Sequence, residues 1–474
     1  MTRPFPNDPM LQDNFAPVMG ECDAPDLVVI EGELPEGLSG SLYRNGPNPM
    51  FPPLGHQHHW FLGEGMIHAI HVENGKAAYT NRWVHTDQYK VQRAAGERLC
   101  STSFEDEGAP RNDIRNVANT NIVHHGGKLL ALDEGSLPVV MDARTLETRG
   151  STDFGGKYVG PFTAHPKLDP RTGEMLAFGY MADGPGTAAL SYSVIDAKGA
   201  LTRHDRFEAP YASMVHDFIT TDEHVIFPVF PATIDVERIL NGGPTIAWDP
   251  KVGTRIGIMR RDAGVESIRW FEGEACYVYH PMNAHTVHVD GRTRVIADVM
   301  KYPRVPLFPN ADGSPAGRSL FDETALLVRW TFDLDDNTSS YREEPLSDLG
   351  GEFPRLDERF AGLANRRGFY AANRRPPSAA NNSFDTLVDI DLATGQRHEW
   401  EPGEGRFVME PVFVPRHEKA AEGNGWLVSL VYDRSRNLSD FVVLDTDDIA
   451  RGPVARVELP NRVPFGFHGN WRNN

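Results

Sequence analysis

The chain has 474 residues and a formal net charge of −19, from 47 Lys and Arg against 66 Asp and Glu, and 40% of its residues are hydrophobic. A balance this acidic argues against binding nucleic acid or an anionic membrane through charge, because both need basic residues. No run of about 18 apolar residues occurs, and the start lacks the apolar region of a secretory signal. The three cysteines, Cys22, Cys100 and Cys276, suit inert thiols in a reducing cytoplasm, the location we expect.

Short apolar runs separated by turn sequences recur along the whole chain. Runs of about 4–8 residues bounded by Gly, Asp, Asn and Pro are typical of β-strands and hairpins. In chain order, we expect strands over residues 128–132, 224–230, 293–298 and 441–445. Helical periodicity is scarce, and the best helix candidates are the short stretches 233–241 and 357–364.

No linker or low-complexity tract divides the chain. The Pro-rich stretches 47–53 and 303–309 lie between apolar segments and are interpreted as loops. We therefore expect one domain over residues 1–474, with a short N-terminal extension over about residues 1–25. Many short strands in one long domain predict an all-β fold, either a propeller or a very large sandwich. No per-blade repeat is present, so the pattern gives no blade count.

Four of the 18 histidines lie in distinctive sequence settings. They are His165 in TAHPKLDP, His216 in SMVHDF, His280 in YVYHPMNA and His468 in PFGFHGN. The intervals between them, 51, 64 and 188 residues, are too wide for a local metal motif. They suit ligands drawn from separate strands that converge on one axis, as the inner strands of a propeller do. From spacing alone, the alternative is four unrelated packing histidines.

The segments around these histidines resemble the carotenoid cleavage oxygenase family, iron-dependent enzymes that cleave alkenes. Besides the histidine settings, the matching segments are GSLYRNGPNP at 40–49, HWFLGEGMIH at 59–68, ANTN at 118–121, EFPR at 352–355 and EPVFVPR at 410–416. Each segment alone is a weak signal, but together they follow the family order over nearly the whole chain. The resemblance implies a seven-bladed β-propeller with a dome of loops and short helices over one face.

The resemblance also implies roles for individual residues. The implied iron ligands are His165, His216, His280 and His468. The implied carboxylate partners are Glu134 for His216, Glu352 for His280 and Glu410 for His468. A ligating imidazole usually donates its other N–H to such a carboxylate, which fixes its tautomer. Thr120 matches the residue whose methyl group crowds one open coordination position, and the alternative is an ordinary strand threonine.

The implied ligand set indicates oxygen chemistry. Four neutral imidazoles would leave two open positions on an octahedral ion, whereas a closed tetrahedral zinc site would have none. Nitrogen ligands suit Fe, Zn, Cu and Ni about equally, so the choice of Fe(II) as cofactor depends on the resemblance. No nucleophile elbow or dinucleotide fingerprint is present. The predicted reaction is cleavage of a C=C bond by O2 to give two carbonyl products, with no external reductant.

Two substrate classes stay open. In the phenolic branch of the family, a Lys directly before the first of these glutamates, and a Tyr about 33 residues upstream of that Lys, hold the substrate phenol. This chain has Asp133 at the Lys position and no Tyr near residues 98–101. Because an Asp would repel a phenolate, we expect a carotenoid or apocarotenoid substrate. Phenolic stilbenes or phenylpropenes, of the resveratrol and isoeugenol type, are the alternative.

His285 stands where the family usually has an aromatic residue. It either faces the substrate pocket or replaces the aromatic ring in packing, which we favour, and we do not expect a fifth ligand. A non-catalytic propeller that binds an apolar ligand is the alternative of a different class, and redirection to isomerisation or ester hydrolysis is a third. The sequence predicts no nucleic-acid partner. It leaves open the oligomeric state and a peripheral membrane contact through an apolar patch.

Overall fold

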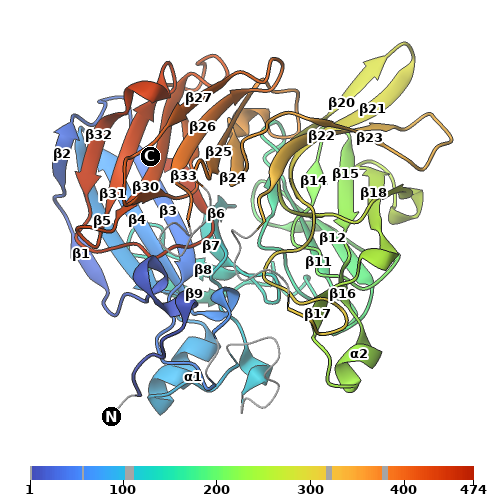
Figure 1. The fold of residues 1–474 in the computed structure, drawn as a ribbon, viewed down its shortest axis with the longest axis horizontal. Helices are drawn as coiled ribbons and strands as arrows, with labels where there is room; N and C mark the ends of the chain where they lie inside the picture. The colour runs from blue at the N-terminus through green and yellow to red at the C-terminus, as the bar shows by residue number, and fades with distance from the viewer. Residues whose placement is uncertain (1–2, 56–57, 102–110, 316–322, 376–382) are drawn as a thin grey trace. The chain divides into compact units, whose positions relative to one another are not determined.

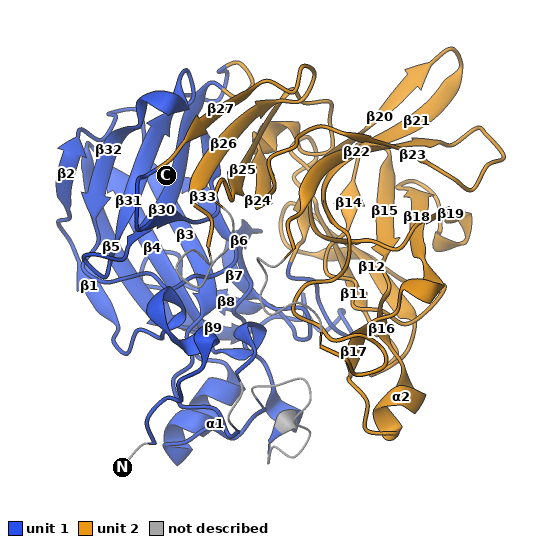
Figure 2. Cartoon of the chain, viewed as in Figure 1, with its two compact units in different colours: residues 1–164, 402–420, 424–474 blue, residues 165–401, 421–423 orange. Residues whose placement is uncertain are grey.

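The structure, a computed structural model, describes residues 3–55, 58–101, 111–315, 323–375 and 383–474. The chain forms two compact units, coloured separately in Figure 2. Unit 1 comprises residues 1–164, 402–420 and 424–474, and unit 2 comprises residues 165–401 and 421–423. The expectation of a single domain stays a prediction beside this division. Among the described helices, none combines the length and the apolar character that crossing a membrane requires.

Unit 1 contains three antiparallel sheets, which we call A, B and G (Figure 1). Sheet A has the order β1-β5-β4-β3-β33, with strands Cys22–Ala24 (β1), Gly40–Pro47 (β3), Gly65–Glu73 (β4), Lys76–Trp83 (β5) and Gly469–Asn473 (β33). Sheet B has the strands Asn121–His125 (β6), Lys128–Leu132 (β7), Val139–Met141 (β8) and Thr148–Ser151 (β9). Sheet G has the order β2-β32-β31-β30-β28, with β29 also paired to β30; its strands are Val28–Gly32 (β2), Arg406–Val408 (β28), Val412–Pro415 (β29), Gly425–Asp433 (β30), Leu438–Asp445 (β31) and Pro453–Glu458 (β32).

Unit 2 contains four antiparallel sheets of four strands each, which we call C, D, E and F. Sheet C has Lys167–Leu168 (β10), Met175–Tyr180 (β11), Ala189–Ile195 (β12) and Leu201–Glu208 (β13); sheet D has Ile219–Thr220 (β14), His224–Val229 (β15), Thr254–Arg260 (β18) and Arg269–Gly273 (β19). Sheet E has Tyr277–Val289 (β20), Arg292–Tyr302 (β21), Leu326–Asp333 (β22) and Arg342–Pro345 (β23); sheet F has Gly351–Leu356 (β24), Arg367–Ala372 (β25), Thr386–Asp391 (β26) and Arg397–Trp400 (β27). A small pair joins Ala232–Ile234 (β16) to Ile246–Trp248 (β17). Figure 1 shows the β20–β21 hairpin extending beyond its neighbours in this unit.

The predicted strands are confirmed: residues 128–132 form β7, residues 293–298 and 441–445 fall within β21 and β31, and residues 224–230 cover β15 and one residue beyond it. Turn chemistry explains the hairpins: Asn74 and Gly75 join β4 to β5 with φ of 52° and 71°, as a two-residue turn of this type requires. Of the two helix candidates, one contains the helix Val236–Leu240 (α2), and the other contains a 3-10 turn, Glu358–Phe360.

The helix Asp87–Ala95 (α1) was not predicted from the sequence. Its end signals are present, since Thr86 accepts a hydrogen bond from the Tyr89 N–H and Gly96 ends the helix with φ of 73°. The buried side chains of this helix include Gln88 and Gln92, which donate to the buried carboxylate of Glu64. Because this helix buries amides, it shows no apolar periodicity.

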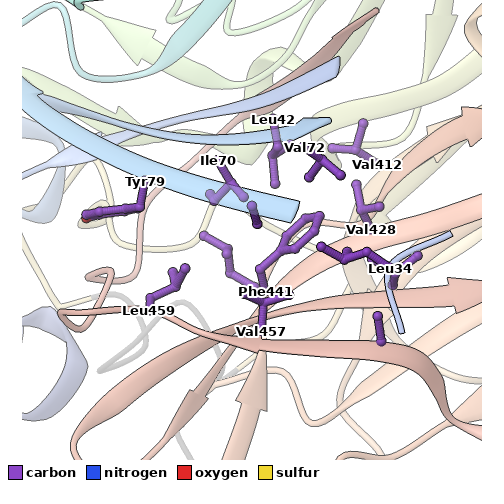
Figure 3. Packing of buried hydrophobic residues seen from close by; sticks show 14 of the residues in the cluster. Leu34, Leu42, Ile70, Val72, Tyr79, Val412, Val428, Phe441, Val457 and Leu459 are labelled. Atoms are coloured by element: carbon purple, nitrogen blue, oxygen red, sulfur yellow. The ribbon is translucent and has the colours of Figure 1, made fainter. Parts of the chain in front are cut away.

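A large hydrophobic core cluster of unit 1 lies between sheets A and G (Figure 3). Leu42 and Ile70 come from sheet A, and Val428, Phe441 and Val457 come from sheet G. The two sheets also combine strands from distant parts of the chain, because β33 pairs with β3 and β32 pairs with β2. Unit 1 is therefore held together by segments that are far apart in sequence.

Candidate metal centre

Three of the predicted ligands come together in unit 2. His165 lies just before β10, His216 just before β14, and His280 within β20, and each of these strands is an edge strand of its sheet. The Nε2 atom of His216 lies 3.1 Å from Nε2 of His165 and 3.2 Å from Nε2 of His280. The three ligand atoms lie within 4.8 Å of one another. The wide sequence spacing of these residues follows from their places on three different sheets.

The three Nε2 atoms fit a metal ion. The Nδ1 atom of His280 lies 2.6 Å from Oε2 of Glu352, and an ionised carboxylate can only accept, so Nδ1 carries the proton and Nε2 the lone pair. Imidazoles bound at about 2.1 Å place adjacent nitrogen atoms roughly 3 Å apart around an octahedral ion. The observed separations of 3.1 and 3.2 Å agree with this value. Neutral imidazoles are ligands for divalent transition metals.

Glu352 is buried at the start of β24, and three groups hold it. Its Oε2 atom accepts from His280 and from the backbone N–H of Phe353. The Tyr302 hydroxyl donates to the same side chain; burial, followed by the charge of Glu352, raises the pKa of Tyr302 well above its ordinary value. Phe353 has φ of 55°, and its ring stacks on His280 with centroids 5.5 Å apart. Backbone strain of this kind is typical of functional sites.

The fourth predicted ligand has a similar carboxylate partner in unit 1. His468 is buried just before β33, and its Nδ1 lies 2.8 Å from Oε1 of Glu410. The other oxygen, Oε2, accepts from the Gly469 N–H at 2.6 Å and from Arg44 at 3.3 Å. These contacts place the proton of His468 on Nδ1 and its lone pair on Nε2. The predicted pairing of His468 with Glu410 is therefore present.

Thr120 lies directly before β6, next to His468 in unit 1. Its backbone carbonyl accepts from the His468 N–H at 3.1 Å, and its hydroxyl donates to Oδ1 of Asn119 at 2.9 Å. Glu134 follows β7 and is partly exposed. Its pairing with His216 stays a prediction.

Asp133 has a structural role that was not predicted from the sequence. Its side chain is buried, and Oδ2 accepts from the backbone N–H groups of Val117 and Ala118 at 3.1 and 3.4 Å. Its Oδ1 accepts from the Gly135 N–H at 3.2 Å. Ala118 itself has φ of 44°, a strained conformation just before Thr120. The carboxylate of Asp133 therefore fixes this backbone segment.

His285 lies on β20, and burial is the main cause that lowers its pKa. The charged groups that act on it are Asp298, Arg329 and Asp222, which are not members of the histidine cluster. Its replacement of an aromatic ring stays a prediction.

Four polar residues around the histidines were not predicted from the sequence: Asp217, Lys167, Arg44 and Tyr302. Asp217 directly follows a predicted ligand, and Lys167 stands two positions after another. For these two residues, closeness in sequence to a predicted ligand is the signal that could have identified them. Nothing comparable marks Arg44 or Tyr302, which lie far from Glu410 and Glu352 in sequence and contact them through their side chains.

Comparison with known proteins gives a consistent result. The family model described as retinal pigment epithelial membrane protein matches residues 15–473. The chain is 38% identical to isoeugenol monooxygenase from Pseudomonas nitroreducens over 99% of both chains, and 32% identical to carotenoid cleavage oxygenase from Mycobacterium tuberculosis over 98% of this chain and 97% of that one. The crystal structure of lignostilbene dioxygenase from Pseudomonas brassicacearum has 37% identity and a TM-score of 0.93, with all of both chains covered.

The fold and the site define an alkene-cleaving oxygenase built on a seven-bladed β-propeller, which confirms the predicted fold class and enzyme class. The seven blades correspond to the sheets A to G. The chain belongs to the carotenoid cleavage oxygenase family, the family of the retinal pigment epithelial membrane protein.

Proposed function

We propose that the protein binds Fe(II) and uses O2 to cleave a C=C bond of a conjugated alkene into two carbonyl products. The observation that carries the proposal is the cluster of three Nε2 atoms, two pairs of which are 3.1 and 3.2 Å apart. The His280–Glu352 contact supports it, because it fixes the tautomer that a metal ligand needs. Membership of an oxygenase family supports iron over the other metals that imidazole accepts.

The proposal assigns the ligands His165, His216, His280 and His468, with Glu134, Glu352 and Glu410 as their carboxylate partners. His468 and Glu134 enter on the family pattern, supported for His468 by its contact with Glu410. When bound, iron supplies the redox chemistry that brings O2 into reaction with the alkene. On an octahedral ion the four imidazoles would leave two coordination positions open, and we assign to Thr120 the crowding of one of them.

For the substrate we propose a phenolic stilbene or phenylpropene. The relatives named for isoeugenol and lignostilbene are more similar to this chain than the relative named for carotenoids. The expected repulsion between Asp133 and a phenolate carries little weight, because that carboxylate is buried and bonded to the backbone. An apocarotenoid is the second candidate, favoured by the absence of the Lys and Tyr that hold a phenol in the phenolic branch.

We propose a cytoplasmic location for the enzyme. All three cysteines are free thiols, and Cys100 and Cys276 are buried. Burial raises the pKa of both thiols, to about 11 for Cys276, which disfavours reactive thiolates. Unpaired, unreactive thiols agree with a reducing compartment.

The test is a product assay on iron-loaded protein under ¹⁸O2. Isoeugenol, resveratrol and an apocarotenal are offered in parallel, and aldehydes are detected by mass spectrometry. We expect labelled aromatic aldehydes from the phenolic substrates, and no product from His280→Ala. The matched control is His288→Ala, an exposed histidine on the same strand that contacts Glu223. Undiminished cleavage by His280→Ala would refute the metal site, and product from the apocarotenal alone would select the second candidate.

A further inference from the structure

His165 is the one predicted ligand that has no predicted carboxylate partner. In the structure its Nδ1 atom lies 3.7 Å from Oδ2 of Asp217. This distance is longer than a hydrogen bond, but both side chains are buried, with exposures of 6% and 4%. At this separation and burial, the carboxylate acts on the imidazole through its charge.

Asp217 is itself held in place on the side away from His165. Its Oδ1 atom accepts from Nζ of Lys167 at 2.7 Å and from the backbone N–H of Phe218 at 2.7 Å. Lys167 reaches this buried carboxylate from a partly exposed position, and its ammonium also lies over the Phe218 ring at 5.9 Å. One carboxylate oxygen is therefore fixed by two donors, and the other is turned toward His165.

The arrangement selects one tautomer of His165. With the proton on Nδ1, the N–H dipole points its positive end at the carboxylate; with the proton on Nε2, the Nδ1 lone pair faces a negative charge and is repelled. The favoured tautomer leaves the lone pair on Nε2, the atom that lies 3.1 Å from Nε2 of His216. Lys167 compensates the charge of Asp217, so the pair adds little net charge beside the cluster.

We propose that Asp217, clamped by Lys167, is a positioning residue that sets the tautomer of His165 for metal binding. This inference depends on the proposed metal site. It differs from the glutamate pairings because the carboxylate belongs to the residue after another ligand, His216. The backbone segment that places His216 before sheet D therefore also orients His165 before sheet C.

Cobalt(II) binding is the test, because Co(II) alone reports affinity by titration and ligand geometry by its visible absorption. The variants are Asp217→Asn, Lys167→Met and the matched control Asp169→Asn. Asp169 is also a buried aspartate, its cation partner is Arg261, and it lies four residues after His165. Circular dichroism and thermal unfolding check that each variant folds.

We expect Asp217→Asn to weaken Co(II) binding roughly 10–100-fold, the range for such ligand partners, and to change the visible spectrum. Lys167→Met leaves the carboxylate without its clamp and is expected to weaken binding about 3–10-fold, and it keeps the test decisive if Asp217→Asn does not fold. Asp169→Asn should change neither quantity. If the wild type binds Co(II) and Asp217→Asn, or Lys167→Met in its place, behaves like Asp169→Asn, this inference is overturned. If the wild type binds no better than His280→Ala, the proposed metal site itself fails.

Discussion

His280 and His468 occupy the same local arrangement on different sheets. In each, Nδ1 lies within 2.8 Å of a buried glutamate oxygen. In each, a backbone N–H next to the glutamate or the histidine donates to that carboxylate, from Phe353 in one case and Gly469 in the other. Each carboxylate is therefore held in position by a backbone hydrogen bond as well as by its contact with the imidazole. Because the backbone fixes the carboxylate, the contact with Nδ1 fixes the orientation of the imidazole ring. The direction of the Nε2 lone pair is fixed with it.

Glu352→Gln tests this arrangement at the residue level. The amide keeps the volume of Glu352 but loses the charge that favours the Nδ1–H tautomer of His280. We expect Co(II) or Fe(II) affinity, measured by competition with a chelator, to fall about 10–100-fold. The control is Glu358→Gln, an exposed glutamate in the turn that follows the same strand. Equal affinities for the two variants would contradict the role of the His280–Glu352 contact.

Asp133→Lys tests whether one substitution can restore the Lys that holds the substrate phenol in the phenolic branch. Asp133 accepts backbone N–H groups from Val117, Ala118 and Gly135, and each unsatisfied buried donor costs about 1–3 kcal/mol. We therefore expect a loss of at least about 3 kcal/mol in unfolding free energy and no gain in isoeugenol cleavage. Thermal unfolding and the aldehyde assay measure these two quantities. Asp133→Asn, which keeps one acceptor oxygen, should lose less. A Lys variant as stable as the wild type, with faster isoeugenol cleavage, would contradict this expectation.

At the scale of elements, every sheet carries at least one predicted site residue at or beside an edge strand. They are His468 beside β33 in sheet A, Thr120 beside β6 in B, His165 beside β10 in C, His216 near β14 in D, His280 on β20 in E, Glu352 on β24 in F and Glu410 near β28 in G. Sequence motifs predicted these residues because their neighbours are distinctive. The blade count could not be derived from residues alone, since the sheets differ in strand number and loop length.

The Asp433 carboxylate links several elements of sheet G through hydrogen bonds. It ends β30, and it accepts from Arg406 on β28 and from Ser435 and Arg436 in the turn before β31. Burial acts to raise the pKa of Asp433, but these hydrogen bonds outweigh it and hold the pKa well below the ordinary 3.8. An aspartate with a lowered pKa stabilises the fold above its ordinary pKa, and this contribution is lost as pH falls through the folded-state value.

We expect Asp433→Asn to lower the unfolding free energy by about 2 kcal/mol at pH 7, the range for hydrogen bonds to a charged group. The difference from the wild type should shrink as pH falls below 3.8, because the unfolded wild type then binds a proton at Asp433 that the folded state does not yet bind. Thermal unfolding of both proteins across this range measures the difference. Asp447→Asn, at a largely exposed carboxylate, is the control. A difference that does not change with pH would show that packing, not charge, is responsible.

At the scale of the molecule, the strand pairing that the sequence could not predict depends on contacts between residues far apart in the chain. Asn470 pairs with Tyr43 in sheet A, and its side chain donates to Asn121 and to the carbonyl of Ile122 in sheet B at 3.0 and 2.9 Å. Pairing between residues this far apart leaves no local sequence pattern, because the sequence of a strand does not identify the strand that it pairs with. Composition and turn spacing predicted an all-β fold; the pairing of the two ends depends on tertiary contacts.

Deletion of residues 470–474 tests how far unit 1 depends on this closure. The deletion removes most of β33, the side-chain contacts of Asn470, and Trp471, which packs against the core between sheets A and G. Each lost hydrogen bond costs on the order of 1 kcal/mol of unfolding free energy. We therefore expect the Tm to fall by roughly 5 °C or more. The exposed edge of β3 should also promote aggregation, measurable by light scattering. Deletion of Asn474 alone, which is exposed and contacts Ser39, should leave both quantities unchanged. A Tm equal to that of the wild type after the longer deletion would mean that β3 and sheet B hold unit 1 together without the C-terminal strand.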